Sequence, residues 1–214
     1  MIIDMHIHEQ TYSFDSFMKL TDIVLRSKEI GLDGICITDH ESNHLKEYAK
    51  EISLAMDFPI FVGAEILTYE GDALAFGVDR LPGRKMYVHE LIQYVHNQGG
   101  IVISAHPYRR NNRGMEDTIK TTKNLDGIEG LNGSTPVDLN LKAYDAALLQ
   151  NIPVFGGSDA HRLERVGKYA TKFPRKIQAM EELVDAIKSG GTQPVYFDRG
   201  TYLEFPYHRL HDVV

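Results

Sequence analysis

Short, nearly continuous runs of apolar residues recur along the chain and predict its strands. They cover residues 2–8, 33–40, 60–66, 73–78, 101–106, 127–132 and 152–159. Runs of this length, without strict alternation of apolar and polar positions, are typical of strands that are covered on both faces, as in a parallel sheet. The pattern therefore predicts seven strands, most of them parallel.

Segments with apolar residues at helical spacing lie between most of these runs. They predict helices at about 16–30, 43–56, 84–98, 136–150 and 176–189. Thr135 is expected to cap the fourth helix with Pro136 at its first position, and two glycines follow the fifth. Alternating strands and helices predict an α/β fold. Seven strands of this kind most simply close into a barrel, with an open doubly wound sheet as the alternative.

Composition and charge narrow the class of protein. The 214 residues, 43% hydrophobic and 25% charged, suffice for an ordinary globular core, so we expect one domain over residues 1–214, with a C-terminal strand or tail at 192–214. The single cysteine, Cys36, excludes an internal disulfide and is expected to be buried. A formal net charge of −7 argues against a broad nucleic-acid surface.

The chain shows no sign of a membrane protein. No apolar stretch approaches the ~20 residues that span a bilayer, and nothing resembles a signal peptide. We therefore expect a cytoplasmic protein that does not interact with membranes.

Possible metal ligands gather at the carboxyl ends of the predicted strands, where α/β folds place their active sites. They are His6, His8, Asp39, His40, Glu65, His106, Asn132, Asp159 and His161. Strand residues two apart point the same way, so Asp4, His6 and His8 are expected to converge. Glu65 stands in an apolar run, where a carboxylate needs a cation or several donors. Asp15 either caps the first helix or reaches back to a metal.

Imidazole and carboxylate side chains together suit Zn, Mn or Fe(II). This many ligands exceeds the needs of one ion, and a carboxylate such as Glu65 or Asp159 can bridge two. Paired divalent ions are a recurrent device for hydrolysing phosphate esters. A phosphate also needs a cationic contact to orient it, and Arg109, Arg110 and Arg113 closely follow His106.

Five motifs resemble the PHP (polymerase and histidinol phosphatase) superfamily. They are DMHIH (4–8), TDH (38–40), GAEI (63–66), SAHPYR (104–109) and GSDAH (157–161). The resemblance spans residues 4–161 and has the motifs in the right order. It implies a distorted (β/α)7 TIM-like barrel with two or three divalent metal ions (Zn, Mn or Fe), and it looks most like the small stand-alone metal-dependent phosphoesterases.

The resemblance also implies roles for individual residues. The implied metal ligands are His6, His8, Glu65 and Asp159 for the first ion, His40 and His161 for the second, and Glu65 with His106 for a third. Asp15 is the nearest match to a further ligand. The family's middle histidine of the third site is missing, and only Asp72 stands nearby. Asp159, His161 and His40 are the expected catalytic residues, with Arg109, and beside it Arg110, contacting the substrate.

The expected reaction is hydrolysis of a small phosphomonoester, nucleotide- or histidinol-phosphate-like, by a metal-bound hydroxide. One alternative is an exonuclease or oligonucleotide phosphodiesterase with the same site, in which nucleic acid is only a substrate. A second is an amidohydrolase, but no strand end here carries the bridging lysine that such enzymes typically use. A third is a non-catalytic metal-bound interaction module, against which the intact ligand set argues.

Overall fold

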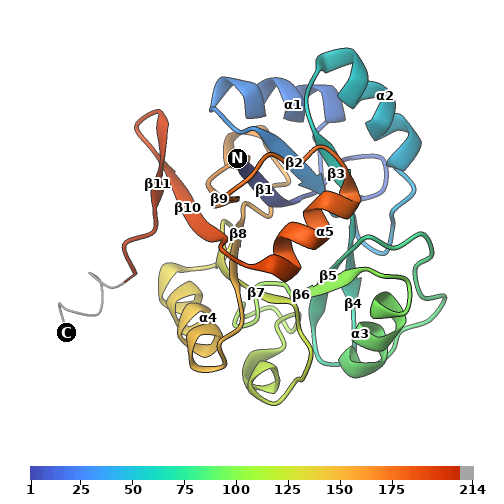
Figure 1. Cartoon of the computed structure of the whole chain (residues 1–214), viewed down its shortest axis with the longest axis vertical. Coiled ribbons are helices and arrows are strands. Elements are labelled where there is room, and N and C mark those ends of the chain that lie inside the picture. Colours follow the sequence, from blue (N-terminus) through green and yellow to red (C-terminus); the bar gives the residue numbers. More distant parts are fainter. Residues whose placement is uncertain (208–214) are drawn as a thin grey trace.

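The computed structural model describes residues 1–207, which hold eleven strands in two sheets (Figure 1). The first sheet has the order β11-β10-β9-β1-β2-β3, and its strands are β1 (Ile2–Ile7), β2 (Gly34–Ile37), β3 (Ile60–Val62), β9 (Tyr169–Lys172), β10 (Gln193–Asp198) and β11 (Thr201–Glu204). The second has the order β4-β5-β6-β7-β8, and its strands are β4 (Ala64–Leu67), β5 (Asp72–Phe76), β6 (Ile101–Ser104), β7 (Gly127–Asn132) and β8 (Val154–Gly157).

Five α-helices cover these sheets. They are α1 (Leu20–Glu29), α2 (Lys46–Met56), α3 (Val88–His96), α4 (Val137–Leu149) and α5 (Met180–Ser189). The predicted α/β class is confirmed, and each predicted helix has a counterpart. No helix within residues 1–207 is long and apolar enough to cross a membrane.

The predicted seven-stranded barrel is not confirmed, because the described strands pair into two sheets rather than one closed sheet. The predicted strand 60–66 breaks at Gly63, where the chain passes from β3 to β4. A Cβ at Gly63 would lie 2.5 Å from the Phe76 ring, so only glycine allows this close crossing. Isolated bridges link the two sheets: Ile7 of β1 pairs with Ala160, just after β8, and Glu65 of β4 pairs with His40, just after β2.

Strand β5 departs from the predicted parallel arrangement. It pairs antiparallel with both β4 and β6, whereas β1-β2-β3 and β6-β7-β8 are parallel. Residues 68–71 form a tight turn between β4 and β5, with the amide of Thr68 donating to the carbonyl of Gly71 at 2.9 Å. A connection this short permits only an antiparallel neighbour. The reversal places the first residue of β5, Asp72, at the edge where most other strands end.

The hydrophobic core has three parts. A central cluster lies between the two sheets and is closed by α5, which contributes Leu183 and Ile187; the strands contribute Met5, Cys36 and Phe155 among others. A second cluster packs α1 and α2 against β1 and β2, and a third packs α3 and α4 against the β4–β8 sheet. Cys36 is fully buried, as its apolar setting predicts.

Helix starts and the C-terminal segment differ from expectation in detail. Helix α1 begins at Leu20, because residues 9–19 form a loop whose hydroxyl groups bond to the ends of β1 and β2. Pro136, not Thr135, occupies the N-cap of α4, and the Thr135 hydroxyl bonds instead to the Asn132 amide oxygen at 3.0 Å.

Strand β9 was not predicted. The expected C-terminal strand at 192–214 corresponds to the β10–β11 hairpin, and residues 208–214 lie outside the described part.

Candidate metal centre

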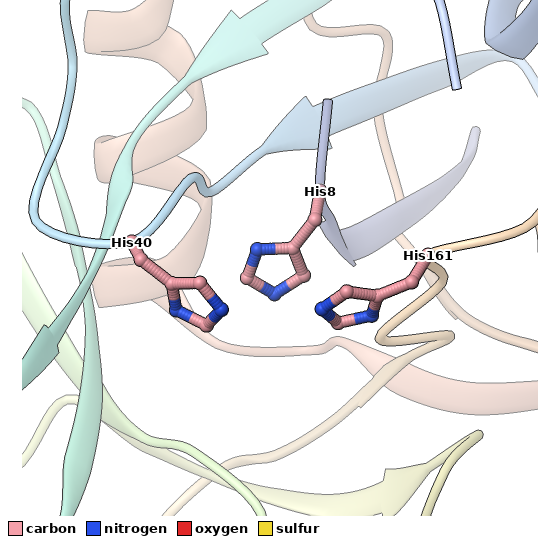
Figure 2. Close-up of side chains that lie close together, drawn as sticks. All are labelled: His8, His40 and His161. Carbon is pink, nitrogen blue, oxygen red and sulfur yellow. The ribbon is translucent and has the colours of Figure 1, made fainter. Parts of the chain in front are cut away.

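The predicted ligands come together at one end of the molecule, where β1, β2, β6 and β8 end. Figure 2 shows three of them, His8, His40 and His161, with their rings turned toward one point. His8 follows β1, His40 follows β2 and His161 follows β8. The rings of His8 and His161 are stacked with 4.3 Å between centroids, and those of His8 and His40 are 4.4 Å apart.

Four overlapping groups of side chains have ligand atoms within 4.8 Å of one another. The groups are His8, His40 and His161; His6, His106 and Asp159; His6, His8 and Glu65; and Glu65, Asp72 and His106. Because His6, His8, Glu65 and His106 each belong to two groups, the arrangement suits several neighbouring ions better than one.

Glu65 lies at the middle of the buried part of this centre. Its Oε1 is 2.8 Å from Nε2 of His106 and 3.7 Å from Nε2 of His6. Its Oε2 is 2.8 Å from Nδ1 of His40 and 3.5 Å from Nε2 of His8. Glu65 is 2% exposed, so these contacts are almost shielded from solvent. A carboxylate with an imidazole on each side in this way is suited to bridge two cations.

Hydrogen bonds behind the histidines of β1 fix which ring nitrogen faces the centre. Nδ1 of His6 is 3.0 Å from Oε1 of Glu129, and Nδ1 of His8 is 3.1 Å from the Ser13 hydroxyl. That hydroxyl donates to Asp39, so it accepts from His8. Both rings therefore present Nε2 to the centre, and their Nε2 atoms lie 3.0 Å apart. Partners of this kind hold metal-binding histidines in one tautomer and orientation.

The solvent side of the centre contains Asp15, His40 and His161. Oδ2 of Asp15 lies 3.3 Å from Nε2 of His40 and 3.4 Å from Nε2 of His161. Asp15 therefore reaches back to the histidines rather than capping α1, whose N-cap is Lys19. Nδ1 of His161 bonds to the carbonyl of Asp159 at 3.1 Å, which leaves its Nε2 for a ligand.

Two buried carboxylates differ from the sequence interpretation. Asp4 does not join the ligand atoms: it accepts hydrogen bonds from the backbone amides of His6, Ser158 and Gly167 and so fastens β1 to the segments after β8. Glu129 was missed, although it stands in the apolar run 127–132 just as Glu65 stands in 60–66. It holds His6 and accepts hydrogen bonds from the backbone amide of His106 and the side-chain amide of Asn132.

The backbone is strained where two ligands enter the centre. His106 and Asp159 have φ values of +27° and +50°, a region that side-chain-bearing residues rarely adopt. Gly157 belongs to β8 and provides space: a Cβ there would lie 2.6 Å from Cβ of His6. Strain held in place by such close packing is typical of functional sites.

Comparisons with known proteins show which sequences and folds the chain resembles. Residues 138–192 match the family model described as PHP-associated. The fold is similar to that of a candidate metal-dependent phosphoesterase from Bifidobacterium adolescentis, with a TM-score of 0.63 and 18% identity over 75% of this chain and 87% of that one. These similarities support the resemblance to the PHP superfamily, by sequence over residues 138–192 and by fold over most of the chain.

One further solved structure has a similar fold, and one further protein has a similar sequence. The lesion-specific endonuclease EndoQ from Pyrococcus furiosus superimposes with a TM-score of 0.64 and 18% identity, covering 99% of this chain and 65% of that one. An uncharacterized protein of Methanocaldococcus jannaschii is 27% identical over 141 residues, which is 62% of this chain and 82% of the relative.

Arginines line the edge of the candidate metal centre. Nη1 of Arg109 donates to Oδ2 of Asp159 at 2.5 Å, so Arg109 reaches the ligands directly. Nε of Arg113 donates to Oδ2 of Asp72 at 2.6 Å, and the amide of Asp72 donates to the carbonyl of Arg113 at 2.7 Å. Arg110, between them, is exposed. The structure thus brings Arg109 to the centre and leaves Arg110 outside it.

Burial and opposite charges set the ionisation of the ligands. Burial opposes the charged form of Glu65, but hydrogen bonds from His106, His40 and His6 hold its pKa well below the usual range. Burial opposes charge on His6 too, yet Glu129 and Asp159 raise its pKa well above that of free histidine. Burial lowers the pKa of His8 to about 4, so this ring is neutral at pH 7.

The donor set fits divalent transition metals. Imidazole and carboxylate are the ligands that Zn, Mn and Fe prefer. Within residues 1–207, four buried atoms of the cluster have no hydrogen-bond partner: Oδ1 of Asp15, Nδ1 of His40, Oδ1 of Asp72 and Nδ1 of His106. A buried polar atom without a partner is costly, and a cation beside Asp72 would remove that cost.

Proposed function

We propose that the protein is a metal-dependent phosphoesterase that hydrolyses a small phosphomonoester, nucleotide- or histidinol-phosphate-like. The observation that carries this proposal is the convergence of His6, His8, Glu65 and Asp159 beside a guanidinium, that of Arg109. Imidazole and carboxylate groups there can hold cations, and the arginine can hold an anion next to them. A phosphate ester is an anion whose hydrolysis uses both.

The residues divide into two proposed ligand sets. His6, His8, Glu65 and Asp159 would hold the first ion, and His40 with His161 the second, with Asp15 completing it. When bound, divalent ions supply acidified water and neutralise charge on the phosphate oxygens. Glu65 contacts both sets, which makes it the proposed bridge.

A third ion would use Glu65, Asp72 and His106. This set meets the distance requirement. However, the Arg113 guanidinium already neutralises Asp72 at 2.6 Å. A cation entering here would meet that positive charge, so we propose two firmly held ions and a third that exchanges more readily.

Arg109 has the proposed task of orienting the substrate. Its side chain is 27% exposed, so it reaches solvent as well as Asp159. An arginine can form two parallel hydrogen bonds to phosphate oxygens and fix the direction of attack on phosphorus. Asp159, His161 and His40 stand around the same space and would position the ions and the attacking water.

The proposal is tested with purified protein reconstituted separately with Zn, Mn and Fe(II). Phosphomonoesters, dinucleotides and short oligonucleotides are the substrates, and Asp159→Asn is the inactivating variant. Asp79→Asn, whose side chain is 98% exposed, is the matched control. Metal-dependent release of phosphate that Asp159→Asn abolishes and Asp79→Asn retains is the expected result.

Other results would redirect the proposal. Preferential cleavage of oligonucleotides would favour the phosphodiesterase. EndoQ, which has a similar fold, is an endonuclease. Metal binding at full stoichiometry without hydrolysis of any of these esters would contradict an esterase and favour a metal-bound interaction module.

A further inference from the structure

The loop between β1 and α1 exposes aromatic rings beside the metal centre. We call residues 12–17 the aromatic loop. Phe14 is 91% exposed, Phe17 is 73% exposed and Tyr12 is 40% exposed. Large apolar side chains are rarely this exposed in neighbouring positions without a binding role.

The aromatic loop is held firmly, so the rings do not point outward by chance. The buried Ser13 hydroxyl donates to Asp39 at 2.8 Å, and the buried Ser16 hydroxyl donates to the carbonyl of His8 at 2.7 Å. The amide of Phe17 donates to the carbonyl of His161 at 3.4 Å. The serines face the protein, and Phe14 and Phe17 therefore face solvent.

The same loop contacts the proposed ligands. Asp15, next to Phe14, lies within 3.4 Å of ring nitrogens of both His40 and His161. The Phe14 ring centroid is 6.5 Å from that of His40. A phosphate seated at the centre would thus leave its alcohol part within reach of Phe14.

A second ring of the aromatic loop, that of Phe17, lies beside a cation. The guanidinium carbon of Arg162 lies 6.0 Å from the Phe17 ring centroid. A groove of about 420 Å³ is lined by Phe17, Met18, Arg162, Leu163 and Glu164. Aromatic faces next to a guanidinium suit a flat, electron-rich ring that carries an anionic group.

We propose that Phe14, supported by Phe17 and Arg162, binds a planar aromatic ring in the alcohol part of the substrate. This inference rests on the proposed phosphoesterase function and deepens it, because it selects nucleoside or aryl phosphates over aliphatic ones. Stacking on Phe14 holds the ring, while the phosphate lies against Arg109 and the metal ligands.

Substrate selectivity gives the first test. For zinc-reconstituted protein, kcat/KM is measured for adenosine 5′-monophosphate, phenyl phosphate and glycerol phosphate. Phe14→Ala is expected to lower the ratio of the aromatic to the aliphatic ester by roughly 5- to 100-fold, the scale of losing one stacking contact. Leu149→Ala, at the exposed end of α4, should leave the ratio unchanged. A ratio within twofold of wild type in Phe14→Ala would overturn the proposal.

Direct binding gives a second test that needs no catalysis. The chain contains no tryptophan, so Phe14→Trp introduces a single reporter that can still stack. In the zinc-loaded variant, adenosine 5′-monophosphate should quench the emission saturably, whereas glycerol phosphate and inorganic phosphate should not. Leu149→Trp is the matched control, because the Leu149 that it replaces is 85% exposed.

The two tests separate the possible failures. Hydrolysis of glycerol phosphate with no preference for aromatic esters, and no quenching of Phe14→Trp, would overturn the aromatic subsite and leave the phosphoesterase intact. Quenching without hydrolysis of any ester would support the subsite and contradict the phosphoesterase. Equal quenching of Leu149→Trp would show that the nucleotide does not recognise Phe14 and would also overturn the subsite.

Discussion

The two sides of the candidate metal centre differ in how firmly the protein holds their side chains. On the inner side, the side chains of His6, Glu65 and His106 are at most 2% exposed, and further buried groups fix them. On the outer side, the side chains of His40, His161 and Asp15 are 20%, 24% and 40% exposed and belong to loops. The inner ligands are preorganised by strands, so an ion there gains affinity at little cost in ordering. The outer ligands can adapt, and we expect their ion to be the one that is open to substrate and solvent.

The largest expected effect comes from breaking the inner side at Glu65. Glu65→Gln keeps the shape but replaces the carboxylate that is proposed to bridge two cations with a neutral amide. We expect loss of at least one metal ion per chain and a fall in kcat/KM of about 1000-fold or more, because metal-based catalysis depends on both ions. Elemental analysis and phosphatase assays measure the two effects.

The outer side provides the matched variant. Asp15→Asn alters a half-exposed contact with His40 and His161. It should lower the metal content and kcat/KM less than Glu65→Gln does. Equal losses in the two variants would show that the inner and outer sides are held alike and would contradict the comparison.

The next effect concerns Arg109, which stands on the border of the two sides. Arg109→Lys should retain the metal content and cut kcat/KM by ~10- to 1000-fold, the scale of losing one charge-assisted transition-state contact. Arg110→Lys should change it less, since Arg110 is exposed and Arg109 reaches Asp159. If Arg110→Lys or Arg113→Lys fails while Arg109→Lys behaves as wild type, another arginine holds the phosphate. If all three variants behave as wild type, no arginine clamp exists.

Ligand positions could be predicted from the sequence where histidine, aspartate or glutamate recurs at strand ends. His6, His8, His40, Glu65, His106, Asp159 and His161 all stand within two residues of an apolar run, and parallel strands carry such positions to one edge. Glu129 carried the same signal as Glu65, a carboxylate in an apolar run, and it could have been found by the same reasoning. Asp4 misled because alternation along a strand does not tell which backbone amides a carboxylate will meet.

Sheet pairing could not be read in the same way. The apolar run 73–78 is identical in kind to its parallel neighbours, and only the short turn before it makes β5 antiparallel. The split between the two sheets at Gly63 depends on the Phe76 ring, a contact between distant parts of the chain. Strand β9 was missed because residues 169–172 mix polar and apolar positions, and its pairing with β1 makes it a strand.

A smaller effect is expected at the third set of ligands. His106→Ala should lower the metal content by up to one ion and weaken activity less than Glu65→Gln, since Arg113 already neutralises Asp72. His96→Ala is the matched control, because His96 pairs with Asp126 outside the centre. A His106→Ala protein with full metal content and full activity would show that His106 holds no ion.

The smallest effect is the dependence of metal binding on pH. Burial opposes charge on His6, His40 and His106, yet neighbouring carboxylates raise the pKa of all three. These rings therefore keep their protons to higher pH in the metal-free protein than free histidine does. An imidazole must lose its proton to bind a metal, so zinc binding should release protons, and the affinity should weaken as pH falls. Calorimetric titration in buffers of different ionisation enthalpy counts the released protons, and zero release would contradict the raised pKa values.

The same shifts predict opposite pH trends of stability with and without metal. A raised histidine pKa stabilises the metal-free fold fully below the unfolded value of about 6.5, and this contribution is lost as pH rises through the raised folded values. The metal-free protein should therefore unfold at lower temperature at pH about 8 than at pH about 6, while zinc-loaded protein should show the reverse, because zinc binds more tightly at high pH. Thermal unfolding of both forms measures the two slopes.

His40→Asn should flatten the metal-free slope less than His6→Asn, because His40 is partly exposed and solvent weakens its pairing with Glu65. An equal flattening would mean that burial does not separate the inner from the outer histidines.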